Sequence, residues 1–222
     1  MRLIAITAFL LASSSGKSQI TKEFEGVIKY QHKFRFNSPN ADSTEIMNAL
    51  GSSSVFYYKK GNYKWVVTSE NNSKVEYFDS KTQTVYSFIG EKDTLFMSRK
   101  NGYDDTLLVF KIEDRADTIC GFACKIAEIF SVTKDDSDLQ TKRIIYYSSA
   151  VSIKPNRFSS YRTYATNKVL EKIKCWPIKI ELESKLMPFI FIIEAIEIIP
   201  KRLLDFEVYL PVNKPIKPLP LF

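Results

Sequence analysis

Short stretches of alternating apolar and polar residues, separated by turn residues, run along most of this chain. This alternation is typical of antiparallel β-strands, whose side chains point to the two faces of a sheet in turn. Because the strands are evenly spaced, the pattern predicts a meander rather than alternating strands and helices. Outside one hairpin, strands are predicted at Phe24–Phe36, Val75–Phe78, Thr84–Ile89, Thr94–Ser98, Leu107–Ile112, Ala123–Val132, Arg143–Tyr147, Ile178–Glu183, Phe189–Ile199 and Phe206–Leu210.

The clearest hairpin spans Val55–Thr68 and turns at Gly61-Asn62. A two-residue loop there specifies the register well, and it places Tyr58 opposite Trp65 and Phe56 opposite Val67. Lys59 and Lys64 then point to the other face, into water. Four apolar side chains are therefore expected on the concave side of the sheet, where they are candidates to contact a ligand: Phe56, Tyr58, Trp65 and Val67.

Three other segments depart from simple alternation. A short helix is predicted within residues 37–51, and an irregular helical crossover at Pro155–Ile173. The strand Phe189–Ile199 is apolar on both faces, which is typical of a strand in mid-sheet with both sides covered. Residues 212–222 are rich in proline and are predicted to form an extended, polyproline-like tail.

The start of the chain has the pattern of a secretory signal. Arg2 precedes the apolar run Leu3–Ala12, and small residues follow as far as Ser18. The run is too short to span a bilayer, and cleavage is expected after Ser18, with Ser15 as the alternative. No cysteine lies near either site, so no lipid anchor is expected. This organisation predicts a signal peptide at 1–18, a curved β domain at 19–211 and a periplasmic or secreted location.

Composition agrees with one globular domain of 222 residues, since 45% of them are hydrophobic and 26% are charged. The basic residues are scattered, which argues against a nucleic-acid partner. The apolar stretch Phe189–Ile199 is too short for a membrane span and contains Glu194 and Glu197, so no transmembrane segment is expected after signal removal.

No set of residues has the pattern of an active site. His32 is the only histidine, and no Gly-x-Ser-x-Gly motif accompanies it. The acidic stretch Asp135–Asp138 lacks the glycine and glutamate of a calcium loop and is interpreted as a polar turn. One histidine and three cysteines give weak support for zinc. The sequence therefore predicts a protein without catalytic residues, metal or cofactor.

The cysteines are interpreted as one disulfide and one buried thiol. Cys120 and Cys175 each precede a predicted strand, and those two strands run parallel if both pair with Arg143–Tyr147. The two cysteines would then lie at the same end of the sheet, which favours a Cys120–Cys175 disulfide. Pairing of Cys124 with either of them, or no disulfide, remains open.

The order of these strand signatures resembles the secreted DUF-type and GLPGLI-type proteins of Gram-negative envelopes, which are similar to the LolA-like lipoprotein carriers. No GLPGLI hexapeptide occurs between Tyr147 and Ile178, which favours a sister family. The segments that carry the resemblance are Phe24–Tyr30, Tyr57–Tyr63, Ile119–Lys125, Ile145–Ser148, Trp176–Ile180, Ala195–Ile198 and Phe206–Pro211.

The resemblance implies a single strongly curved antiparallel sheet, an incomplete LolA-like barrel with helical segments covering its concave face. In the carriers that hollow holds acyl chains, and the family brings no catalytic residues. The expected function is therefore binding of a lipid or other apolar ligand. The alternative is a structural or interaction module with a filled core, which would contact an envelope protein partner.

Overall fold

The computed structural model describes residues 22–37, 43–70, 73–88, 94–99, 105–133, 136–211 and 213–218. The predicted signal peptide lies outside this part of the chain. The described strands are β1 (Gly26–Phe36), β2 (Ser53–Lys59), β3 (Asn62–Thr68), β4 (Ser73–Asp79), β5 (Thr84–Phe88), β6 (Leu95–Arg99), β7 (Asp105–Ile119), β8 (Phe122–Thr133), β9 (Asp136–Ser152), β10 (Cys175–Ser184), β11 (Phe189–Pro200) and β12 (Ile216–Pro218). The described helical segments are α1 (Ser43–Leu50), η1 (Pro155–Phe158), η2 (Thr163–Ala165), α2 (Thr166–Ile173) and α3 (Asp205–Val208).

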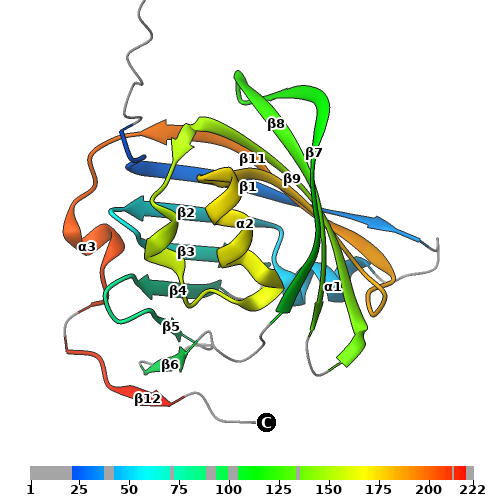
Figure 1. Ribbon diagram of the computed structural model, residues 1–222. Coiled ribbons are helices and arrows are strands. Elements are labelled where there is room, and N and C mark those ends of the chain that lie inside the picture. The colour runs from blue at the N-terminus through cyan, green and yellow to red at the C-terminus, as the bar shows by residue number, and fades with distance from the viewer. Residues whose placement is uncertain are drawn as a thin grey trace, which may run out of the picture.

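The strands form one sheet in the order β12-β6-β5-β4-β3-β2-β1-β11-β10-β9-β8-β7. The sheet curls into an open, half-barrel-like shape without closing, and β12 and β7 are its edges (Figure 1). All neighbours pair antiparallel except β12, which runs parallel to β6. The strand β1 pairs with β11, so the beginning and end of the domain meet in mid-sheet. The predicted mainly β architecture is confirmed.

Every strand predicted before residue 200 overlaps an observed strand, and the crossover forms η1, η2 and α2. Two strands are much longer than predicted, β7 and β9. The added part of β7 is mostly polar, and its residues 114–118 are exposed. An edge strand with little apolar burial does not need the alternation that marks a half-buried strand, so the sequence pattern did not reveal it.

The hairpin β2–β3 turns at Lys60-Gly61, one position earlier than predicted, with positive φ values of 50° and 86°. Tyr58 therefore lies opposite Tyr63, and Phe56 opposite Trp65. The predicted register was wrong by two residues, which leaves every side chain on its predicted face. Asn62 belongs to β3 rather than the turn because its Oδ1 accepts a hydrogen bond from the Ser80 backbone N–H at 2.9 Å.

Residues 206–210 were predicted to form a strand, but the short helix α3 lies there instead. The Glu207 carboxylate accepts a hydrogen bond from the Leu204 backbone N–H at 2.8 Å, which satisfies a donor at the helix start. Val208 is buried against the convex face of the sheet. Local capping and this one apolar anchor favour a helix over a strand that would have no partner.

Lys59 does not point into water as the sequence suggested. Its side chain is 12% exposed and forms an ion pair with Asp205 at 2.9 Å. Its Nζ also donates a hydrogen bond to the Leu203 carbonyl. The convex face of the hairpin is therefore covered here by α3 and the segment before it.

β11 lies between β1 and β10, as expected for a mid-sheet strand. Its convex face is only partly covered, since Ile196 is 59% exposed, and this corrects the expectation of cover on both sides. Glu197 pairs with Lys29 at 2.7 Å, and Glu194 with Lys33 at 3.6 Å. The two acidic residues therefore form cross-strand ion pairs with β1 on this partly solvated face.

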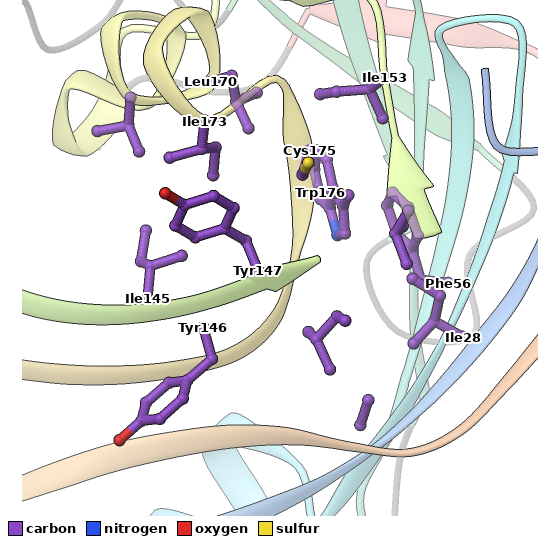
Figure 2. Packing of buried hydrophobic residues seen from close by; sticks show 14 of the residues in the cluster. Ile28, Phe56, Ile145, Tyr146, Tyr147, Ile153, Leu170, Ile173, Cys175 and Trp176 are labelled. Atoms are coloured by element: carbon purple, nitrogen blue, oxygen red, sulfur yellow. The ribbon is translucent and has the colours of Figure 1, made fainter. Parts of the chain in front are cut away.

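The main core lies on the concave face. Phe56 stacks on Trp176 with ring centroids 4.3 Å apart, and Phe158 of η1 stacks on Phe78 at 5.3 Å. Figure 2 shows Tyr147 pointing toward α2 while its neighbour Tyr146 points to the other side of β9. Side chains of α2 are buried in the same cluster. The crossover thus packs directly on the concave face.

No helix in the described residues is long and apolar enough to cross a membrane. In the tail, Ile216–Pro218 forms β12 beside β6, and the Leu95 backbone N–H donates to the Pro215 carbonyl at 2.9 Å.

Candidate ligand-binding cavity

A cavity of about 330 Å³ lies between the concave face and the crossover. Side chains from β1, β3, β9, β10, β11, η2 and α2 line it, together with single residues from α1 and two loops. Among these described residues Arg143 is the only charged one, and Thr166 is the only one with an aliphatic hydroxyl group. The other lining residues have aromatic or aliphatic side chains or are methionine or proline. The cavity is therefore an apolar space with very few polar groups.

Of the four side chains predicted to face a ligand, only Trp65 lines this cavity. Phe56 and Tyr58 are fully buried in the packed core beside it. The rings of Phe56 and Trp65 meet edge to face at 5.8 Å. Val67 is half-buried and lies against Gly51. The structure thus places Trp65 at the cavity and Phe56 and Tyr58 in the core beside it, while Val67 belongs to neither.

Tyr30 and Trp176 form the part of the cavity wall next to that core. The Tyr30 hydroxyl donates a buried hydrogen bond to the Pro177 carbonyl at 2.8 Å. Burial strongly raises the pKa of Tyr30, so it stays protonated. This bond satisfies the carbonyl of a proline within β10, where the strand bends at a register shift.

Arg143 extends from β9 on the same side as Ile145, and it is 5% exposed. Burial lowers the pKa of its guanidinium to about 10, so it carries a charge at neutral pH. It donates hydrogen bonds to the Tyr164 carbonyl and to Thr166 Oγ1, the latter at 3.4 Å. The Tyr164 backbone N–H in turn donates to Asp105. These bonds hold the backbone of η2 against the sheet.

Tyr164 and Ala165 both have left-handed backbone conformations, with φ values of 56° and 53°. Neither is glycine, so this segment carries strain that its surroundings must compensate. The hydrogen bonds from Arg143 and to Asp105 supply that compensation at the edge of the cavity.

A Ser54–His32 pair lies at the α1 side of the sheet, and no sequence motif indicated it. His32 Nε2 lies 2.9 Å from Ser54 Oγ, and Nδ1 lies 3.1 Å from the Gly51 carbonyl. Because a carbonyl only accepts, Nδ1 carries the proton and Nε2 accepts from Ser54. Ser54 is 1% and His32 7% exposed. The two side chains therefore form a buried polar link between β1 and β2.

The predicted Cys120–Cys175 disulfide is not present. All three cysteines of the chain are described, and all are free thiols. The strands β8, β9 and β10 are neighbours as predicted. However, Cys120 lies in the β7–β8 turn with φ of 52° and donates to the Ala195 carbonyl of β11 at 3.0 Å, whereas Cys175 is buried in the main core.

Most of the cavity wall was missed because strand alternation assigns faces but does not show where two layers leave a gap. One signal was available. Arg143 lies on the same face of its strand as the core residues Ile145 and Tyr147, because the three are two positions apart. A charged residue at a core-facing position is unusual. Within the described residues no three potential metal ligands gather at one place.

No family model matches this chain, and no curated protein matches it either. The fold and the site together describe an open antiparallel half-barrel with an apolar cavity on its concave side.

Proposed function

We propose that this protein is a non-catalytic binder of a lipid or other apolar ligand, and that the ligand occupies the concave-face cavity. The observation that carries the proposal is the apolar lining of a space of about 330 Å³. Small-molecule sites are usually concave, mostly apolar and at least about 300 Å³ in volume. An empty apolar space of this size costs stability, because its walls lose packing contacts.

The arrangement around the cavity agrees with a LolA-like carrier, in which helical segments cover the hollow of an incomplete barrel. Here η2 and α2 contribute Tyr164, Val169 and Leu170 to the wall opposite the sheet. The export signal proposed from Leu3–Ala12 would direct such a binder to the periplasm or out of the cell. We therefore expect acyl chains of envelope lipids as the ligand.

A cavity-filling substitution tests the proposal. Ile193 of β11 lines the cavity, and its neighbour Ile192 lies on the opposite face of the same strand. Ile193→Trp should abolish lipid that copurifies with the protein, whereas the matched control Ile192→Trp should retain it. Native mass spectrometry of protein purified from its own envelope gives the readout as a mass difference between each protein with and without ligand.

Two results would reject the proposal. One is the absence of bound lipid from the wild-type protein; the other is equal lipid on both variants. The first result would favour the structural or interaction module, with the cavity as a packing defect.

A further inference from the structure

Arg143 is the one charged side chain among the described residues that line the cavity. It projects from the middle of β9, where Ile129 of β8 and Leu182 of β10 lie beside it. A guanidinium that is 5% exposed has lost most of its hydration. Burying such a charge is unfavourable unless partners replace the lost water.

The partners of this guanidinium do not fully replace that water. Its two described hydrogen bonds go to the Tyr164 carbonyl and Thr166 Oγ1, both uncharged. Its Nε–H is buried and has no hydrogen-bond partner. Tyr164 and Asp105 are near enough to favour the charged form, but among the described contacts Arg143 and Asp105 form no ion pair. The charge is therefore incompletely compensated.

Asp105 does not face the same space as Arg143. It lines a neighbouring hollow together with Thr141 and Ser184, and its Oδ2 is engaged by the Tyr164 backbone N–H. Tyr164 contributes to the walls of both spaces and lies between them. A ligand in the main cavity would therefore meet the guanidinium rather than the carboxylate.

A second unpartnered donor belongs to the same cavity. Trp65 lines the wall, and its indole Nε1–H is buried without a partner. An indole N–H and a guanidinium can donate hydrogen bonds but cannot accept them. A ligand that satisfies both groups must therefore supply acceptor atoms, and the guanidinium is best paired with an anion.

We propose that the cavity binds a long-chain amphiphile with a single anionic head group, a carboxylate or a phosphate, and that Arg143 pairs with this head group. The apolar tail then lies against β10 and β11, where Ile180 and Ile193 line the wall. This inference rests on the proposed function and specifies its ligand class. It assigns Arg143 two tasks, binding the anion and holding the η2 backbone beside it.

Both tryptophans of the chain line the cavity, so tryptophan fluorescence reports directly on its occupancy. The probes are dibromostearate, dibromostearyl alcohol and dibromostearoyl lysophosphatidate, because bromine quenches a tryptophan that it contacts. Wild-type protein freed of copurified lipid should bind the carboxylate or the phosphate at least about tenfold more tightly than the alcohol. The relative affinities of the carboxylate and the phosphate identify the head group.

Arg143→Met should remove this preference while the alcohol still binds, and Arg143→Lys should retain part of it. Arg157→Met is the matched control, since Arg157 also donates to a backbone carbonyl, that of Lys60, but lies outside the cavity wall. Circular dichroism checks that each variant folds. If Arg143→Met does not fold, the affinities of the wild-type protein for the acid and the alcohol still test whether the cavity prefers an anionic head group.

Equal wild-type affinities for acid, phosphate and alcohol would overturn the anionic head group and leave the proposed function standing. A preference for the acid that survives in folded Arg143→Met would also overturn the role of Arg143. Absence of quenching by all three probes would reject the proposed function itself.

Discussion

Phe56 and Trp65 lie opposite each other in one hairpin but have different surroundings. Phe56 is fully buried and stacked on Trp176, whereas Trp65 is half-buried and borders the cavity. Phe56→Ala should lower the free energy of unfolding by about 3–5 kcal/mol, the cost of deleting a packed aromatic ring. Trp65→Ala should cost only about 1–2 kcal/mol, because less packing is lost.

Urea unfolding of both variants measures the difference. Equal large losses would show that Trp65 belongs to a filled core, and this would count against the cavity. Equal small losses would show that Phe56 is not packed as described.

His32 should make stability depend on pH. Burial lowers its pKa below the ordinary value of 6.5 in the folded protein. Its stabilising contribution is therefore complete above pH 6.5 and is lost as the pH falls toward the folded pKa, because the unfolded chain binds the proton more readily. The slope is at most about 1.4 kcal/mol per pH unit for one group.

Unfolding of the wild type and His32→Gln at pH 7.5 and 5.5 isolates this effect, since the chain has no other histidine. The variant should lose less stability than the wild type over this interval. An identical loss in both proteins would show that His32 does not titrate as a buried group.

At the scale of elements, the β7–β8 turn makes one cysteine distinct from the other two. Cys120 is exposed, and Cys124 and Cys175 are buried. Burial of its sulfur and the nearby Glu194 and Glu197 raise the pKa of Cys120, which slows but does not prevent its reaction. A thiol reagent should therefore modify one cysteine in the native protein and three in denaturant.

Mass spectrometry of the modified protein counts and locates these thiols. Detection of only one reactive thiol in denaturant would show that the other two form a disulfide. If the reactive thiol were Cys124, that outcome would restore the Cys120–Cys175 pairing inferred from strand order.

The sequence predicted the strands well because apolar and polar residues alternate along a half-buried strand, and this alternation can be read directly from the sequence. It failed at α3, where a cap at Glu207 and one buried contact at Val208 decide the local structure. It also failed for most of the cavity. The face that a residue occupies follows from its odd or even position along the strand. A gap between the sheet and η2–α2, by contrast, depends on how elements distant in the chain pack together.

At the scale of the whole molecule, the half-barrel combines a tightly packed aromatic core with a neighbouring space that the same strands leave open. The core supplies rigidity at β2–β4, where Phe78 and Tyr63 stack at 5.4 Å. The cavity lies where β10 bends at Pro177 and the crossover returns over the sheet. The packed core and the proposed binding cavity therefore occupy adjacent parts of one concave surface.

The pairing of β1 with β11 also has a consequence in time. Tyr30 lies opposite Ala195, so the first strand of the domain cannot find this partner until nearly the whole chain is available. Closing such a long loop costs conformational entropy, which slows the formation of this one strand pair. The sheet therefore cannot be completed before β11 has been synthesised, and until then one edge of β1 has no strand to pair with.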